Sequence, residues 1–372
     1  MVYLVSEDYL ENAAETNRLF AFVRAMVVSG IDVSVVYINH CPLKTVHGAQ
    51  VVSLLQGKAY PRLFEKLSAP SRLSRFAKRL TSDDSLVFMT TTAAMFPVAF
   101  SHNRRFSVFH EKTEKPGITR PDTFVYRLFW RIYYPACRRL DGLFVISQSL
   151  RTHFIDKGVE SSKIHIVNMV VDPDRFNGVS KAPSYRYVAF CGTLSNKKDG
   201  VDLLIKAFSS VVCKDDSIKL VLLGKYNDKS DSLVNEELIH SLGLTNHVEL
   251  LGDVSYEQVP HILKNAEVLA LARPMSIQAQ FGFPTKVGEY LLTGNPVVLT
   301  DVGDIPLFLK DGENALVARA GDVKGFADRL IFALNNKAQA ERIGTAGYQT
   351  ALKFFNCQIE TKKILDAIKS AR

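Results

Sequence analysis

The sequence predicts an α/β protein of two doubly wound, Rossmann-like domains that face a central cleft. The chain has 372 residues, more than a single hydrophobic core usually fills, so two domains are expected. Short apolar runs alternate with helical patterns along most of the chain, which indicates parallel sheets covered on both faces. This alternation stops in a turn-rich stretch near residues 172–183 and then restarts, which places the domain boundary there.

Six apolar runs in the first half have the length and composition of strands. They cover residues 2–5, 33–38, 85–89, 106–110, 142–147 and 163–168. Residues 15–29 carry apolar side chains at helical spacing and are followed by Gly30, a typical C-terminal stop of a helix. Residues 121–139 form a second predicted helix. The first domain is expected to cover residues 1–177.

The second half repeats this alternation. Its expected strands cover residues 186–190, 218–224, 247–252, 267–272, 295–300 and 314–318, and its helices begin near Gly200, Ser232, Ser255 and Thr285. The second domain is expected to cover residues 178–352, and residues 353–372 form a helix that could pack back on the first domain. Ligands of such open sheets bind beyond the carboxyl ends of the strands, so two of these domains enclose a cleft.

The composition, with 47% hydrophobic and 23% charged residues, excludes a disordered chain and a fibre. Five scattered cysteines without a Cys-x-x-Cys pair argue against a disulfide framework and a thiolate zinc site, and they favour the reducing cytoplasm. The chain starts with Glu7 and Asp8 where a signal peptide would be basic, and no apolar stretch is long enough to span a membrane.

The positive charge is concentrated in the first half. The net charge is +8, and residues 1–180 hold 23 Lys and Arg against 16 Asp and Glu. This excess suits an anionic partner such as a phospholipid surface, a polyanionic or lipid diphosphate substrate, or a nucleic acid. The simpler alternative is that the extra cations only keep the protein in solution. The sequence contains no nucleic-acid recognition module, so a nucleic-acid partner is not expected.

The segment QFGFPTKVGEYLLTGNPVVLT predicts a phosphate and ribose site in the second domain. Pro284 sets a turn before a helix, so the amides of Thr285, Lys286 and Val287 are expected to point into open space. Free amides beside the ammonium group of Lys286 form an anion site. Glu289 follows one turn later, near enough to accept hydrogen bonds from the ribose of a bound nucleotide.

This segment resembles the signature of family 4 retaining glycosyltransferases of the GT-B fold, in which a Gly-Phe-containing loop opens a helix that carries a glutamate. Gly282 supplies the glycine of that loop, and the resemblance implies that Glu289 binds the ribose of the donor. The first glutamate of the family motif would stand at Phe281. Gln278 and Gln280 lie beside this position and could bond the hydroxyls of the transferred sugar without charge.

A second phosphate motif is CGTLSNKKDG, which follows an apolar strand. Gly192 permits a close approach of the backbone, and Lys197 and Lys198 precede the next helix; solvated lysines on an ordinary turn are the alternative. The segment resembles the family pattern Gly-Arg-Leu followed by Lys-Gly, whose cations neutralise the leaving diphosphate. Thr193 stands in place of the arginine, and the resemblance implies a catalytic role for Lys198 or Lys197, with Lys198 slightly favoured.

Further donor-binding candidates follow two strands. Gly252 ends one of them, and the resemblance places the next residues, Asp253 and Val254, beside the base of the nucleotide. Arg273 stands where the family has a loop that faces the donor, so it is a candidate for binding phosphate or acceptor. A surface ion pair is the alternative for Arg273.

His110 is the candidate catalytic residue of the first domain. It ends an expected strand, and the acids Glu111 and Glu114 follow it, which is a good position for polar chemistry at a cleft. Related enzymes carry a similar His-Glu-x-Thr-Glu run, and the resemblance implies that His110 faces the transferred sugar; a purely structural histidine is the alternative. Residues around Asn12, with Glu15 at a helix start, resemble the small-residue loop of the family that lies against the donor.

No metal site is expected. Asp172 and Asp174 form the Asp-x-Asp pair of metal-dependent transferases, but two carboxylates without further oxygen ligands make a poor magnesium site. The pair lies in a segment that resembles the interdomain Asn-x-x-Asp-x-x-x-Phe stretch of the family, which favours turn and capping roles. No resident cofactor is expected, because the nucleotide diphosphate sugar is the donor substrate.

Residues 61–80 combine cations with apolar side chains, and Leu73, Phe76 and Leu80 recur at helical spacing. Such segregation is typical of a helix that lies in a membrane interface. The alternative is a helix that covers the sheet, with cations that extend to solvent.

The resemblance covers almost the whole chain. It implies a hexosyltransferase-type enzyme that moves a sugar from a nucleotide diphosphate sugar to a hydroxyl of a glycan or lipid-linked acceptor, with retention and without a metal. The setting is expected to be cell-surface polysaccharide biosynthesis, in the cytoplasm and in possible contact with the inner face of the membrane. A sugar-nucleotide epimerase of GT-B architecture is the alternative enzyme, and a basic nucleic-acid-binding protein is the alternative outside the enzymes.

Overall fold

The computed structural model of the protein describes residues 1–10, 13–55, 62–118 and 123–372, without the side chains of Arg62 and Leu63. Three residues used in the sequence predictions, Asn12, Pro61 and Pro121, lie outside the described residues.

The chain forms two compact units. One contains Met1–Val170 and Cys357–Arg372, and the other contains Val171–Asn356. The predicted domain boundaries follow residues 177 and 352, whereas the chain changes units after Val170 and after Asn356.

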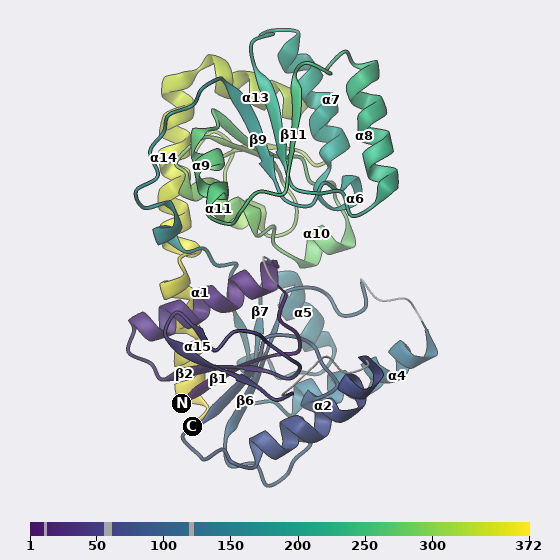
Figure 1. The fold of residues 1–372 in the computed structure, drawn as a ribbon, viewed down its shortest axis with the longest axis vertical. Helices are drawn as coiled ribbons and strands as arrows, with labels where there is room; N and C mark the ends of the chain where they lie inside the picture. Colours follow the sequence, from purple (N-terminus) through teal and green to yellow (C-terminus); the bar gives the residue numbers. More distant parts are fainter. Residues whose placement is uncertain (11–12, 56–61, 119–122) are drawn as a thin grey trace. The chain divides into compact units, whose positions relative to one another are not determined.

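Within the described residues, the first unit holds an eight-stranded sheet covered by helices (Figure 1). The strand order is β3-β4-β2-β1-β5-β6-β7-β8; β3 pairs antiparallel with β4, and the other neighbours pair parallel. The strands are β1 (Val2–Ser6), β2 (Val33–Tyr37), β3 (Thr45–Val46), β4 (Ala49–Ser53), β5 (Ser85–Phe88), β6 (Ser107–Lys112), β7 (Gly142–Val145) and β8 (Ile164–Ile166). The helices are α1 (Ala14–Val28), α2 (Arg62–Ala77), α3 (Met95–Ala99), α4 (Phe124–Arg138), α5 (Gln148–Asp156) and α15 (Cys357–Ser370).

The second unit holds a six-stranded parallel sheet in the order β11-β10-β9-β12-β13-β14. The strands are β9 (Tyr187–Cys191), β10 (Lys219–Leu223), β11 (Val248–Gly252), β12 (Val268–Leu271), β13 (Val297–Thr300) and β14 (Leu316–Ala318). The helices are α6 (Asn196–Asp199), α7 (Val201–Val212), α8 (Lys229–Ser241), α9 (Gln258–Asn265), α10 (Ile277–Phe281), α11 (Lys286–Leu292), α12 (Ile305–Phe308), α13 (Val323–Asn335) and α14 (Lys337–Phe354), after the short 3₁₀ helix η2 (Pro173–Phe176).

The strands expected from the apolar runs all form, which confirms the predicted α/β class. Most of their side chains are buried on both faces, because helices cover both sides of a parallel sheet. No apolar run predicts β3 and β4. Their two-residue turn, His47 and Gly48, has positive φ at both positions, which is the geometry of a tight β-hairpin.

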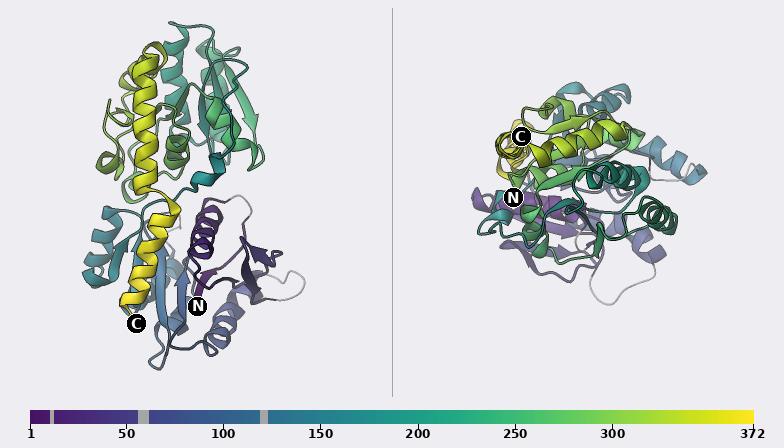
Figure 2. Two further views of the ribbon diagram at one scale, coloured as in Figure 1. Left: turned by 90° about the vertical axis from the view of Figure 1, so that its left-hand side faces the viewer. Right: turned by 90° about the horizontal axis from the view of Figure 1, so that it is seen from above.

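The last helix, α15, packs on the first unit and is drawn in yellow in Figure 2. Its Glu360 is fully buried; one carboxylate oxygen accepts from the amide of Asn168 (2.7 Å) and the other from Nζ of Lys363 (2.6 Å). The predicted helix over residues 353–372 begins later, at Cys357, because α14 extends to Phe354.

Helix α2 covers the sheet with the apolar side chains that had suggested a membrane interface. Leu73 and Leu80 are buried, and Phe76 packs edge-on against Tyr3 at 5.3 Å between ring centroids. Arg72 also turns inward, because its Nη2 donates to Oδ1 of Asn39 at 2.8 Å. The side formed by Leu73, Phe76 and, just after the helix, Leu80 therefore faces the sheet and is not available to a membrane. No helix within the described part of the chain is both long and apolar enough to cross a membrane.

Candidate functional site

The candidate site of the second unit lies where β9, β10 and β12 end. Gly192 (φ 144°) and Gly224 (φ 126°) follow two of these strands in conformations that other residues rarely adopt. A Cβ atom at Gly192 would collide with the side chain of Lys286, and one at Gly224 with the backbone of Gly192. These close contacts pack the turn after β9 against α11 and bring Lys286 to the carboxyl edge of the sheet.

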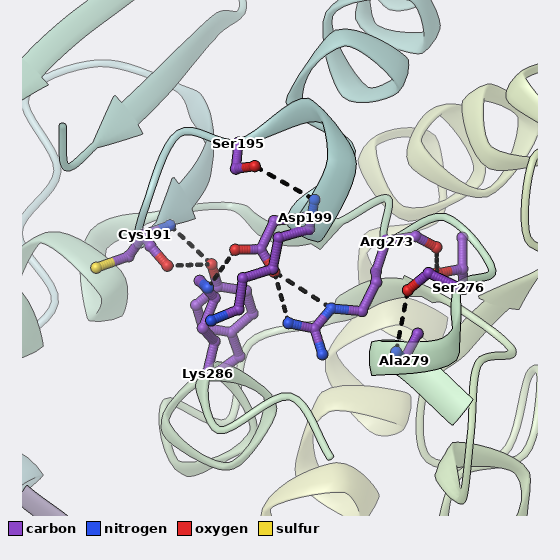
Figure 3. Close-up of polar contacts among 10 residues, drawn as sticks. Cys191, Ser195, Asp199, Arg273, Ser276, Ala279 and Lys286 are labelled. Carbon is purple, nitrogen blue, oxygen red and sulfur yellow. Dashed lines mark hydrogen bonds and ion pairs between the residues drawn. The ribbon is translucent and has the colours of Figure 1, made fainter. Parts of the chain in front are cut away.

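Asp199 lies at the centre of this site (Figure 3). Its carboxylate is buried; Oδ1 accepts from Nη2 (2.8 Å) and Nε (3.2 Å) of Arg273, and Oδ2 accepts from Nζ of Lys286 (2.7 Å). Asp199 ends α6, Arg273 follows β12 and Lys286 begins α11. Three segments of the second unit therefore converge on one carboxylate.

This Asp199 cluster, formed by Asp199, Arg273 and Lys286, carries more positive than negative charge, because two cations share one carboxylate. Burial raises the pKa of Asp199, but Lys286 and Arg273 outweigh burial and hold the pKa below its ordinary value. Burial lowers the pKa of Lys286, and the charge of Asp199 offsets part of this effect. An unbalanced cation in a site shielded from water attracts an anion.

Lys197 and Lys198, the lysines expected to neutralise phosphate, lie on α6 beside Asp199, and their side chains are exposed. The helix is capped by Ser195, whose Oγ accepts from the amide of Lys198 at 3.3 Å. Thr193 is half-buried in the same turn. The structure thus brings Arg273 and Lys286 onto one carboxylate and leaves the two predicted lysines at the surface of the same loop.

Glu289, the expected ribose ligand, lies half-buried on α11 and forms an ion pair with Arg175. The guanidinium of Arg175 also stacks on the ring of Tyr256, 3.6 Å from its centroid, and donates to the carbonyl of Tyr256 at 3.0 Å. Burial raises the pKa of Glu289, and the cations of Arg175 and Lys286 offset part of this rise. The predicted ribose acceptor is therefore held by an arginine in this structure.

The turn before α11 differs in one respect from the prediction. Pro284 and Thr285 precede the helix, with Thr285 at its N-cap position. The amide of Val287 does not point into open space, because it donates to the carbonyl of Pro284 at 3.1 Å in a tightened first turn. The helix has only seven residues, so the side chain of Lys286, more than the helix terminus, supplies the positive charge.

Gln278, Gln280 and Phe281 lie on α10, in the connection between β12 and α11. Gln280 is exposed, and Gln278 and Phe281 are half-buried. Gly282 ends α10 and is buried. The two glutamines therefore lie on the same connection as Arg273, next to the position of the missing glutamate.

Asp253 and Val254 follow β11 at the carboxyl edge of the same sheet. Asp253 is exposed and forms an ion pair with Lys225, which follows β10. Val254 is half-buried.

His110 is fully buried in β6 of the first unit. The expectation that the strand ends there is wrong, because the pairing with β7 continues to Lys112 and Val145. Nδ1 of His110 donates to the carbonyl of Phe88 (2.9 Å), and Nε2 lies 3.0 Å from the hydroxyl of Tyr133. Burial lowers the pKa of His110 to about 3, so its ring is neutral at neutral pH.

Glu111, the next residue of β6, is buried against Arg18 of α1, with Nε of Arg18 2.8 Å from its Oε1. Burial raises the pKa of Glu111, and the charge of Arg18 offsets part of this rise. The remaining donors of Arg18 bond the carbonyls of Asn168 (2.7 Å) and Val167 (3.1 Å). Glu15 lies exposed in the first turn of α1.

The Asp-x-Asp pair has the predicted capping role. Oδ1 of Asp172 accepts from the amide of Asp174 at 3.1 Å and caps η2. Among the residues that the structure describes, no group of three or more His, Cys, Asp or Glu side chains could hold a metal ion.

Sequence reasoning missed Asp199 and Arg175. Asp199 bonds residues 74 and 87 positions away in the chain, and Arg175 bonds a residue 114 positions away. No local pattern reveals such pairs. The one local signal is the Asp-Gly step at Gly200, which indicates a turn but not the partners of Asp199.

Comparisons with known proteins match both halves of the chain. The family model "Glycosyltransferase Family 4" matches residues 16–175, and "Glycosyl transferases group 1" matches residues 173–350. A phosphatidyl-myo-inositol mannosyltransferase of Mycobacterium leprae is 24% identical over 254 residues, 67% of this chain and 62% of that protein. An uncharacterized glycosyltransferase of Methanocaldococcus jannaschii is 25% identical over 200 residues, 52% of this chain and 53% of that protein. The chain thus spans between about half and three fifths of the length of these curated relatives.

Solved structures share the fold over nearly the whole chain. HepE of Anabaena in complex with UDP superposes with a TM-score of 0.78 at 18% identity and covers 99% of both chains. A glycosyltransferase from Rickettsia africae superposes with a TM-score of 0.79 at 13% identity and covers 100% of this chain and 98% of that one. The fold is therefore GT-B, as predicted. With the two family models, this shows that the chain belongs to the family 4 type of GT-B glycosyltransferases.

Proposed function

We propose that the protein transfers a sugar from a nucleotide diphosphate sugar to a hydroxyl of a glycan or lipid-linked acceptor. The observation that carries this proposal is the Asp199 cluster, whose unbalanced positive charge suits the diphosphate of such a donor. HepE of Anabaena was solved with UDP and with UDP-glucose, which supports a nucleotide sugar as the donor.

The chemistry follows from where charge develops during transfer. When the bond between the anomeric carbon and the diphosphate breaks, negative charge builds up on the leaving oxygens. Lys286 and Arg273 would stabilise this charge without a metal, and Lys197 or Lys198 would add a cation from α6. Asp199 holds both cations in place before the donor arrives, so that little reorganisation accompanies the reaction. Retention of the anomeric configuration is part of the proposal.

The other candidates take supporting roles. Glu289 would exchange Arg175 for the ribose hydroxyls, and Asp253 and Val254 would lie beside the base. Gln278 and Gln280 would bond hydroxyls of the transferred sugar. His110 would have to exchange its bond to the hydroxyl of Tyr133 to contact that sugar, because its ring is fully buried and both nitrogens are bonded. Its low pKa makes the ring a neutral hydrogen-bonding group and not a charged acid.

The proposed setting is cell-surface polysaccharide or lipid-linked glycan assembly, in the cytoplasm at the inner face of the membrane. Two observations support it. The net charge of +8 suits an anionic surface or acceptor, and one relative is named for the mannosylation of phosphatidyl-myo-inositol.

A transfer assay tests the proposal. The protein would be incubated with labelled UDP-, GDP- and ADP-sugars and a lipid extract, in the presence of EDTA. We expect one donor to label the extract, since arginine and lysine replace the metal. The new glycosidic bond should keep the anomeric configuration of the donor sugar. Abolition by EDTA and rescue by magnesium would overturn metal independence. Conversion of the donor to an epimeric sugar nucleotide without acceptor would overturn the transferase proposal in favour of an epimerase.

A further inference from the structure

The first half of α4 presents a stripe of large apolar side chains to solvent. Phe124 is 80% exposed, Val125 71% and Leu128 49%, and Ile132 continues the row one turn later. Residues at these spacings share one side of a helix. Isolated exposed apolar side chains are common, but four on one helix form a patch that typically marks an interaction site.

A second apolar face fixes α4 to the first unit. Tyr133, Ala136 and Cys137 are buried, and the hydroxyl of Tyr133 lies 3.0 Å from Nε2 of His110. Phe129 packs against Phe96 of α3 at 5.2 Å between ring centroids. Because the opposite side of the helix is held by these contacts, α4 cannot rotate to bury its exposed stripe.

Cations flank this α4 stripe, defined as Phe124, Val125, Leu128 and Ile132. Arg127 and Arg131 are exposed on the same helix. Helix α3 packs against both α4 and α2, and Figure 1 draws α2 and α4 on the same side of the first unit.

The start of α2 continues the pattern. Its Phe64 and Leu67 are exposed, and so are the cations Lys66 and Arg75. This side of the first unit therefore combines apolar groups with positive charge.

We propose that the α4 stripe, with the start of α2, inserts into the surface of an anionic phospholipid bilayer. Apolar side chains would enter the acyl region while Arg127 and Arg131 bind headgroup phosphates. The charge selects this occupant over a second copy of the chain, because a second copy would bring the same arginines to the interface. The inference deepens the proposed function, since it supplies the reason for a membrane-bound acceptor. Binding to vesicles does not itself require sugar transfer.

A tryptophan placed in the stripe reports insertion. The single native tryptophan, Trp130, lies on the opposite side of α4 against Phe129, Tyr133 and Tyr134, so the reporter is Leu128→Trp in a Trp130→Phe background. Vesicles of equal parts phosphatidylglycerol and phosphatidylcholine should shift its emission to shorter wavelength, and lipids brominated along the acyl chain should quench it. Vesicles of phosphatidylcholine alone should bind less protein, and added salt should weaken binding to the anionic vesicles.

A triple variant tests the stripe directly. In sedimentation with the anionic vesicles, Phe124→Ser/Val125→Ser/Leu128→Ser should bind at least about tenfold more weakly, because three apolar side chains no longer leave water. The matched control is Leu233→Ser/Val234→Ser on α8 of the second unit, where the parent side chains are 57% and 47% exposed. The control should bind vesicles as the parent does.

Binding of nucleoside diphosphates, measured by calorimetry, should be unchanged in both variants. This separates the inference from the proposed function, because either result can fail while the other holds. Three outcomes would overturn the inference: equal sedimentation of the triple variant and the parent, no quenching of the Leu128→Trp reporter in vesicle-bound protein, or a dimer that the triple variant breaks without any change in vesicle binding.

Discussion

The two units bury charge in different ways. In the first unit, Arg18 and Glu111 pair one to one, and the remaining donors of Arg18 bond the carbonyls of Val167 and Asn168. In the second unit, Asp199 faces two cations and can neutralise only one of them. The difference teaches how to distinguish a charge network that holds a fold together from one prepared for a ligand. A balanced network leaves nothing for an anion, whereas an unbalanced one does.

The largest expected effect concerns the balanced network. Arg18→Met should lower the free energy of unfolding by about 3 to 5 kcal/mol, because it leaves the carboxylate of Glu111 buried without its partner. Urea unfolding followed by circular dichroism measures this loss. The double variant Arg18→Met/Glu111→Leu should recover much of it. A loss below about 1 kcal/mol, the usual range of an exposed ion pair, would show that this pair is not structural.

The second prediction concerns the unbalanced network. Lys286→Met should reduce the transfer rate about 10²- to 10³-fold, or about 2.7 to 4 kcal/mol, because it removes a donor aimed at the developing charge. The stability should change little, since Asp199 keeps Arg273. Lys198→Met, on the exposed side of α6, is the matched variant and should have a smaller effect. The reverse order of effects would transfer the catalytic role to Lys198.

A third prediction tests the ribose contact. Glu289→Gln should weaken binding of the preferred nucleoside diphosphate by about 1.5 to 3 kcal/mol, because a charge-assisted hydrogen bond is lost. Calorimetry gives this difference, with the exposed Glu236→Gln on α8 as control. Equal affinity of the Glu289 variant and the parent would remove Glu289 from the ribose site.

The smallest effect, counted per pH unit, is the pH dependence that His110 gives to the stability. Its pKa is about 3 in the folded protein and about 6.5 in an unfolded chain, so below pH 6.5 the unfolded state binds a proton that the folded state does not. The contribution of His110 to the free energy of unfolding is fully present above pH 6.5. It falls by roughly 1.4 kcal/mol per pH unit as the pH drops towards 3. His110→Gln should flatten the unfolding free energy against pH. If the unfolding free energies of the variant and the parent change in parallel with pH, His110 is not buried as a neutral ring.

Much of the fold could be predicted because its signals are local. Apolar runs and turn residues located the strands of both sheets except β3 and β4, and the spacing from Pro284 to Glu289 located the start of α11. The end of β6 could not be predicted, because its pairing with β7 carries it two residues past His110.

The face of α2 was ambiguous for a different reason. Leu73, Phe76 and Leu80 have the same spacing in a membrane helix and in a helix that covers a sheet, so the pattern cannot choose between them. The candidate site was predicted in its residue types but not in its pairing. Lys286 was predicted to bind phosphate and Arg273 to bind phosphate or acceptor. Asp199, which joins them, becomes visible only when distant segments meet.

The central claim is that the unbalanced charge at Asp199 binds a diphosphate. Calorimetry of UDP, GDP and ADP against their parent nucleosides, on the parent protein and on Lys286→Met, tests it most directly. We expect one diphosphate to bind the parent at least about tenfold more tightly than its nucleoside, and this preference to disappear in the variant. If the preferred diphosphate and its nucleoside bind the parent equally, or if Lys286→Met keeps the preference, the claim is contradicted.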